Sequence, residues 1–208
     1  MAVGKSTTKS VALILGSVRA GRNGPRVAKL VTETIQKNLP EEIELKVIDL
    51  AEWNFPIFDQ AEIPFTVKGW ENYTSEITRN WSREISGHDG FIFLVPEYNS
   101  SYAGPLKNAF DYLYNEWAGK TAVLINYGAR PVNALRGGSH FNDVISDLQM
   151  KVSSLIPKIS VSTMDREKTA AGDDLVFYEE SVKQQVQADI ATAWDEAVKS
   201  LLTAPASA

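Results

Sequence analysis

The chain has 208 residues, a net charge of −5, and apolar and charged fractions that are ordinary for a globular protein. This length favours one medium-sized domain, and the acidic balance argues against a general nucleic-acid surface. The absence of cysteine excludes disulfides, thiol catalysis and thiolate metal sites. With only two histidines, His88 and His140, a multi-histidine metal site is not expected either.

The apolar runs and the N-terminal segment bear on the cellular location of the protein. No apolar run approaches the roughly 20 residues that span a bilayer, and the polar N-terminus lacks the core of a signal peptide. We therefore expect a cytoplasmic protein without a membrane span. A single domain is expected over residues 10–202, between a flexible N-terminus (1–9) and a flexible tail (203–208).

Short apolar runs alternate with helix-period segments along the whole chain. The predicted strands are residues 11–15, 43–50, 91–95, 122–125 and 155–161. The predicted helices cover about 25–39, 73–86, 105–114 and 141–150, with a last one inside 174–202. This alternation predicts a three-layer, doubly wound α/β domain with a five-stranded parallel sheet in the flavodoxin-like order 2-1-3-4-5. Pro157 interrupts the fifth strand and argues for an edge position or a bulge.

The loop after the first strand, residues 16–26, has the composition of an anion site. The N-terminus of the following helix offers free N–H groups and partial positive charge. Donor side chains surround it, and a proline suits the first helical turn: Ser17, Arg19, Arg22, Arg26 and Pro25. The loop contains neither Gly-x-Gly-x-x-Gly nor a P-loop, which favours a single terminal phosphate. The alternative is an ordinary loop with solvated arginines.

Polar residues also follow the third and fourth strands. Pro96-Glu97-Tyr98-Asn99 ends the third strand, and the N–H groups after the proline are expected to be free for acceptors such as those on the edge of a flavin ring. Tyr127-Gly128 ends the fourth strand, where the glycine permits close backbone approach. In the predicted strand order a ligand lies at these carboxyl ends. A phosphate loop, an aromatic segment and a glycine turn together describe an FMN site.

Several motifs closely resemble those of the NAD(P)H-dependent FMN reductase family, and its fungal quinone and azo-dye reductases in particular. They are Gly16-Ser17-Val18-Arg19, Pro96-Glu97-Tyr98-Asn99 and Leu106-Lys107-Asn108-Ala109 with Asp111. The continuation Tyr114-Asn115-Glu116-Trp117 strengthens the comparison. The resemblance covers about residues 11–161 with order and spacing intact, and only the combined pattern is specific.

The resemblance implies tightly bound FMN, a homodimer or tetramer, and NAD(P)H as co-substrate, with NADPH favoured. Quinones, azo compounds or free flavin would then take the hydride in a ping-pong cycle at flavin N5, without a catalytic side chain. It also implies site residues: Ser17 and Arg19 on the phosphate, Arg22, Pro25 and Arg26 nearby, Pro96, Glu97, Tyr98 and Asn99 on the ring, and Tyr127 and Gly128 flanking it. The alternatives are a flavodoxin-like electron carrier and a regulatory protein whose partner binding follows flavin redox state.

The sequence departs from the family at two places. Arg22 and Gly24 stand where many relatives have Ser and Asn, and Ala129-Arg130-Pro131 replaces the glycines of the fourth loop. These changes put individual phosphate contacts in doubt and can alter nicotinamide access or substrate width.

Four other groups of side chains carry expectations. Tyr98 either stacks on the second substrate or is a core or interface aromatic. Lys107 and Asp111 are expected to support their helix as an i,i+4 pair, and both histidines to be structural. For the aromatics of the irregular segment we favour a subunit interface that also walls the flavin pocket, the alternative being a cover for the sheet's own core: Trp53, Phe55, Phe58, Phe65 and Trp70.

Overall fold

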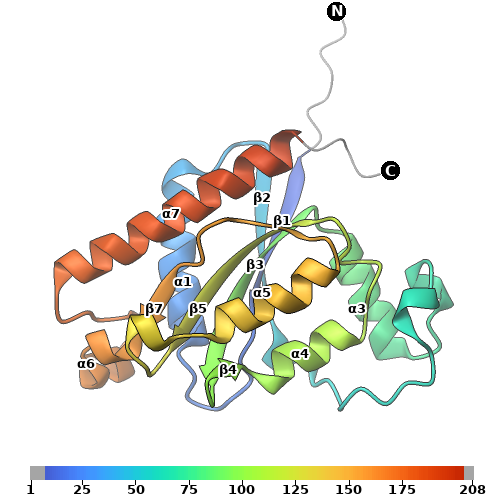
Figure 1. Cartoon of the computed structure of the whole chain (residues 1–208), viewed down its shortest axis with the longest axis horizontal. Coiled ribbons are helices and arrows are strands. Elements are labelled where there is room, and N and C mark those ends of the chain that lie inside the picture. Colours follow the sequence, from blue (N-terminus) through green and yellow to red (C-terminus); the bar gives the residue numbers. More distant parts are fainter. Residues whose placement is uncertain (1–7, 204–208) are drawn as a thin grey trace, which may run out of the picture.

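The computed structural model describes residues 8–203, which form a central sheet between two layers of helices (Figure 1). The strands are β1 (Lys9–Leu15), β2 (Ile43–Asp49), β3 (Gly90–Tyr98), β4 (Ser101–Tyr102), β5 (Thr121–Gly128), β6 (Lys151–Val152) and β7 (Lys158–Ser160). The α-helices are α1 (Gly24–Ile35), α2 (Leu50–Trp53), α3 (Glu76–Ser86), α4 (Gly104–Asp111), α5 (Gly137–Asp147), α6 (Arg166–Ala171) and α7 (Glu180–Thr203). The expected flexible ends lie mostly outside the described residues.

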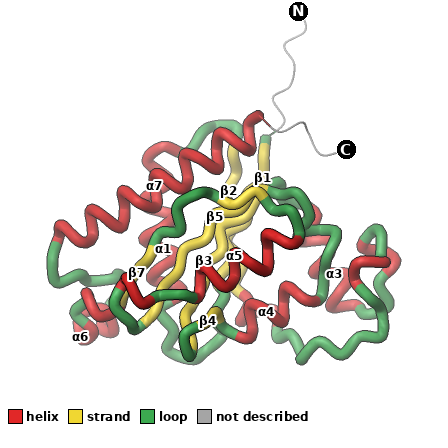
Figure 2. The backbone as a smooth tube through the Cα atoms, in the orientation of Figure 1, coloured by secondary structure: helices red, strands yellow, loops and turns green. Residues whose placement is uncertain are grey.

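The sheet order is β2-β1-β3-β5-β6, and every pairing along this path is parallel. This confirms the predicted flavodoxin-like order. In this order β1 lies between β2 and β3, so the direction in which successive strands are added to the sheet reverses at β1. Figure 2 shows the strands running side by side through the middle of the molecule, with helices on both sides. The carboxyl ends of β1, β3 and β5 therefore meet at one edge of the sheet, where this strand order places a ligand site.

Alternating side chains build two apolar cores, one on each face of the sheet. In β1, Leu13 faces the core under α1 and α7, whereas Ile14 faces the core under α3, α4 and α5. Both residues are at most 1 % exposed, as expected for a parallel strand covered on two sides. Trp194 of α7 and Trp81 of α3 are among the largest fully buried side chains, one in each core.

The fifth strand differs from its predicted bounds. It begins at Lys151 rather than Leu155 and consists of two short pieces, β6 and β7, which both pair with β5. Pro157 lies in the gap between them, where its carbonyl accepts a hydrogen bond from Asn126 N (2.9 Å). The expected bulge or edge position is thus present, because proline cannot donate to the ladder.

The third strand is longer than predicted, and the helix after the irregular segment is shorter. Helix α3 begins at Glu76, three residues after the predicted start at Tyr73. Strand β3 continues through Tyr98 and turns back into β4. Asn99 and Ser100 both have positive φ (51° and 68°), as a two-residue type I′ turn requires. The expected loop is therefore a hairpin, and its pairing with β4 engages part of the backbone that we expected to be free.

The aromatics before α3 divide into two groups. Trp53 and Phe55 pack around the buried Trp81, with ring centroids 4.7 and 5.3 Å from it, and Phe58 packs on Tyr112. These three cover the sheet's own core, which is the alternative that we did not favour. The remaining two are at the surface: Phe65 is 57 % and Trp70 36 % exposed.

Candidate functional site

The three predicted segments meet at the carboxyl edge of the sheet. Gly16 N donates to Leu94 O (3.1 Å), which joins the end of β1 to β3, and Pro96 lies opposite Tyr127 in the β3–β5 register. A Cβ on Gly16 would stand 2.7 Å from Leu94 O, so only glycine fits between the strands here. The fold therefore brings the phosphate loop, the hairpin and the glycine turn together.

Ser17 is the buried centre of the phosphate loop. Its side chain is fully buried, and its Oγ lies 2.5 Å from the Tyr98 hydroxyl at the end of β3. Pro25 occupies the first turn of α1, as predicted, and no acidic residue lies in that turn. The helix N-terminus is thus free to attract a negative charge.

The three loop arginines have different partners. Arg19 is exposed and donates only to the adjacent Ala20 O (3.1 Å), so its guanidinium is available to an anion. Arg22 forms an ion pair with Asp49, the N-cap residue of α2. Arg26 donates to Gly172 O (2.8 Å) and Ala170 O (3.4 Å) at the end of α6. Arg22 thus connects the loop to the start of α2, and Arg26 connects it to the end of α6.

Glu97 fixes the hairpin to the start of α5. Its Oε2 accepts hydrogen bonds from Arg136 N (2.5 Å) and Gly137 N (2.8 Å), while Oε1 is buried without a partner. A carboxylate is well placed there, because the N-terminus of a helix carries partial positive charge. Glu97 therefore positions the loop after β5, and we find no basic side chain on it among the described residues.

Tyr127 and Gly128 lie at different parts of the edge. The Tyr127 side chain belongs to the core beneath α1, and its hydroxyl is buried without a hydrogen-bond partner among the described residues. Burial raises the pKa of Tyr127, with the neighbouring Tyr98 adding to the shift. A Cβ on Gly128 would stand 2.9 Å from Glu97 Cβ, so the glycine is required by Glu97. Tyr127 thus reaches the phosphate loop, and Gly128 adjoins the hairpin.

A cavity with a volume of about 610 Å³ opens beside these segments. It lies between Val18 of the phosphate loop, the segment 50–57 and the N-terminus of α4. Its wall is mostly apolar, with Asn54, Lys107, Asn108 and Asp111 as the polar groups. Lys107 and Asp111 form the predicted i,i+4 ion pair (2.5 Å). A cavity of this size accommodates a flat organic molecule.

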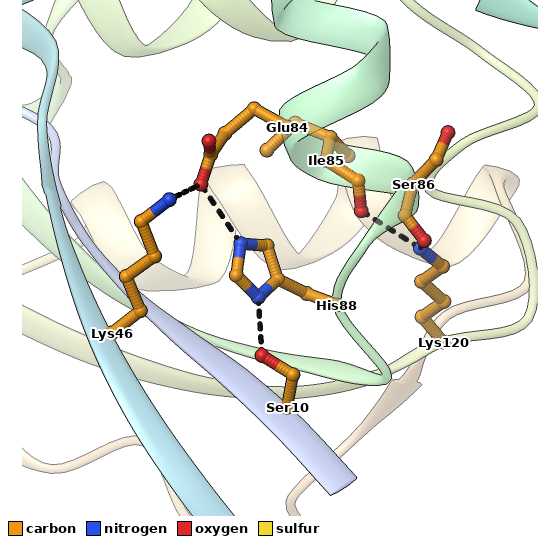
Figure 3. A network of polar contacts seen from close by, with 7 residues as sticks. All are labelled: Ser10, Lys46, Glu84, Ile85, Ser86, His88 and Lys120. Carbon is orange, nitrogen blue, oxygen red and sulfur yellow. Dashed lines mark hydrogen bonds and ion pairs between the residues drawn. The ribbon is translucent and has the colours of Figure 1, made fainter.

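The two histidines lie at different ends of the sheet. His88 is buried at the amino end, where Nε2 lies 3.1 Å from Glu84 Oε1 and Nδ1 lies 2.8 Å from Ser10 Oγ (Figure 3). Burial lowers the pKa of His88, and Glu84 opposes this shift. His140 lies near the site, with Nδ1 3.1 Å from Ser101 Oγ. His88 is structural, as expected.

Two other kinds of site are absent within residues 8–203. No group of three or more metal-ligating side chains is present. No helix in this part of the chain is long and apolar enough to cross a membrane.

Sequence reasoning missed three features of the site. The ion pair of Arg22 joins residues 27 positions apart, the Arg26 bond to Gly172 joins residues 146 apart, and the Glu97 bond to Arg136 joins residues 39 apart. Contacts this distant carry no local pattern. A signal was available only for the hairpin, because asparagine adopts positive φ more readily than most residues and Asn99 follows a strand.

Known proteins share sequence with most of this chain. Residues 10–162 match the model of the NADPH-dependent FMN reductase family. The chain is 36 % identical over 203 residues to an NAD(P)H-dependent FMN reductase of Nectria sp., which covers 94 % of this chain and 98 % of the relative. It is also 36 % identical over 164 residues to one of Saccharomyces cerevisiae, covering 74 % and 83 % of the two chains.

A solved structure supports the fold independently. The flavoenzyme NAD(P)H:(acceptor) oxidoreductase of Paracoccus denitrificans superposes with a TM-score of 0.66 at 18 % identity, covering 92 % of this chain and 98 % of that one. The fold, the converging motifs and the family match point the same way. The chain belongs to the NADPH-dependent FMN reductase family.

Proposed function

We propose that this protein binds FMN at the carboxyl ends of β1, β3 and β5 and acts as an NAD(P)H-dependent FMN reductase and quinone reductase. The observation that carries the proposal is the convergence of Ser17, Pro96 and Gly128 at one sheet edge, within the residues that match the family. Open α/β sheets bind their ligands at this edge.

The residues at the edge fit the two halves of FMN. The N-terminus of α1, the Ser17 hydroxyl and the exposed Arg19 guanidinium are the donors for a phosphate. Pro96 to Asn99, held by Glu97, and the close-packed Gly128 form the wall for the flat ring. FMN, when bound, supplies the hydride acceptor, and the chain supplies position and electrostatics.

The protein's contribution to the reaction is a rigid support. Glu97 ties the hairpin to the loop after β5 through two backbone N–H groups, so both segments keep their distance while the co-substrate and acceptor exchange. No side chain at this edge needs to act as a nucleophile or general acid. A ping-pong cycle follows if NAD(P)H and the acceptor use the same face in turn.

Several finer points are part of the proposal. Azo compounds and free flavin as acceptors, a preference for NADPH and a cytoplasmic location stay predictions. A homodimer is supported by large apolar side chains exposed on the segment before α3, namely Ile57 (80 %), Ile63 (66 %) and Phe65 (57 %). Exposed apolar groups gathered on one segment are typical of an interface.

A visible spectrum of the purified protein, with and without added FMN, tests the proposal first. Anaerobic mixing with NADPH and with NADH then separates an enzyme from a carrier: fast bleaching of the bound flavin, followed by reoxidation by a quinone, is expected. A protein that stays colourless with FMN refutes flavin binding. A coloured protein that neither nicotinamide bleaches refutes the reductase and supports an electron carrier.

A further inference from the structure

We propose that the hydroxyls of Ser17, Tyr98 and Tyr127 together bind the phosphate of the flavin, so that Tyr98 serves the phosphate end of the site and not the second substrate. We call these three side chains the hydroxyl cluster. The inference rests on the proposed function. It assigns Tyr98 and Tyr127 to the phosphate of FMN, whereas the sequence motifs placed both residues at the flavin ring.

The three hydroxyls come from three neighbouring strands. Ser17 follows β1, Tyr98 ends β3 and Tyr127 lies near the end of β5. Ser17 Oγ and Tyr98 OH are 2.5 Å apart. The Tyr127 hydroxyl is close to the start of α1, since a Cβ on Gly24 would stand 3.2 Å from it. Its neighbours include the charges of Tyr98 and Arg22, and Ser17 acts on it through a side-chain hydrogen bond. The cluster therefore lies at the N-terminus of α1.

The cluster has more donors than the protein uses. A hydroxyl has one hydrogen to donate, and Ser17 and Tyr98 share one hydrogen bond between them. Tyr127 is 7 % exposed, and its buried hydroxyl makes no hydrogen bond of standard geometry among the described residues, although the Ser17 hydroxyl lies close enough to interact with it. Buried polar groups are nearly always satisfied. One of the three hydrogens is used in the Ser17–Tyr98 bond, and the oxygens of a phosphate can accept the other two.

The charges around the cluster favour an anion. The first turn of α1 contains no acidic residue, and its N–H groups add partial positive charge. The neighbouring carboxylate, Asp49, is neutralised by its ion pair with Arg22. Arg19 donates only to a backbone carbonyl and keeps an exposed guanidinium nearby in the same loop.

The position of Tyr98 separates this role from substrate stacking. Its side chain is 37 % exposed, yet its hydroxyl is directed onto the buried Ser17. The hairpin turn at Asn99 and Ser100 holds Tyr98 in place at the end of β3. A side chain that is anchored in this way by its hydroxyl presents its polar end to the phosphate loop.

The test compares two flavins that differ only in the phosphate. Apo-protein is titrated with FMN and with riboflavin, and flavin fluorescence gives both dissociation constants. Tyr98→Phe and Tyr127→Phe each remove one hydroxyl and keep the ring. We expect each to weaken FMN binding about tenfold or more, as for a hydrogen bond to a charged group, and riboflavin binding less than twofold. Tyr178→Phe, at a residue that is 65 % exposed, is the matched control and should change neither.

The outcomes distinguish this inference from the proposed function. Wild-type protein that binds neither flavin refutes both. Wild-type protein that binds FMN, with Tyr98→Phe either without effect or weakening FMN and riboflavin by the same factor, refutes the hydroxyl cluster alone. Thermal unfolding of each apo variant checks folding, and if Tyr127→Phe is destabilised, the half-exposed Tyr98 carries the test.

Discussion

The two ends of the sheet differ in how completely their buried polar groups are hydrogen-bonded. At the amino end, His88 has a partner on each ring nitrogen, and Glu84 also pairs with Lys46 (Figure 3). At the carboxyl end, several buried polar atoms have no protein partner. Of the six such side-chain atoms among the described residues, four lie there: Arg22 Nε, Glu97 Oε1, Asn126 Oδ1 and Tyr127 OH.

This difference separates polar groups that stabilise the fold from polar groups that are available to bind a ligand. A completed network, such as the one around His88, needs no ligand to explain it. An incomplete one costs stability unless something else binds, and it lies where the strand order places a ligand. The amino end therefore needs no ligand to complete its hydrogen bonds, and the carboxyl end is where we propose that FMN binds. The following variants test that contrast.

Glu97→Ala is expected to have the largest effect. The two N–H groups at the start of α5 lose their acceptor, which should reduce the free energy of unfolding by about 2–4 kcal/mol and weaken FMN binding. Urea unfolding and flavin titration measure both. Glu84→Ala at the amino end is the control, and its flavin affinity should match wild type. Equal loss of flavin affinity in both variants would contradict the proposal that only the carboxyl end of the sheet supports flavin binding.

Gly128→Ala and Gly90→Ala compare tight glycines at the two ends. The added methyl group would meet Glu97 Cβ at 2.9 Å in the first and Leu201 Cδ2 at 2.8 Å in the second. Overpacking of this kind costs about 1–3 kcal/mol, and less where the end of a side chain can move. Only Gly128→Ala should also weaken FMN binding, because it displaces Glu97. Unchanged flavin affinity in Gly128→Ala would contradict the assignment.

His88 should give a smaller effect, confined to acidic pH. Its pKa is lowered in the folded protein, so the unfolded chain binds more protons once the pH falls below about 6.5. Its contribution to stability is therefore full at pH 8 and is lost as the pH falls through 6.5 towards the folded pKa. His88→Gln should flatten the decline in unfolding free energy between pH 8 and pH 5. A slope identical to wild type would show that His88 does not titrate on unfolding.

Arg26→Ala should have the smallest effect. Its guanidinium bonds two carbonyls at the exposed end of α6, and their loss should cost about 0.5–1 kcal/mol of stability. FMN affinity should change less than twofold, whereas Arg19→Ala should weaken it about tenfold, as loss of a charge-assisted bond does. If Arg26→Ala weakened FMN as much as Arg19→Ala, both arginines would belong to the phosphate site.

Sequence patterns predicted the strand order because each buried strand carries its own apolar run and each βα loop its own motif. They also located Ser17, Pro96 and Gly128 correctly at one edge, since parallel strands share their carboxyl ends. The sequence patterns missed the contacts between residues that are far apart along the chain. Nothing near Arg26 indicates a helix 140 residues later, and an Asn-Ser turn is a weaker hairpin signal than Asn-Gly.

The split fifth strand has a consequence for how copies of this protein can meet. An uninterrupted edge strand presents a row of unpaired backbone groups on which a second sheet can continue. Here that edge is made of two short pieces separated by a gap with Pro157, so it offers no long template for strand addition. Extension of one sheet into another, and the fibrous aggregation that can follow from it, is therefore disfavoured along this side.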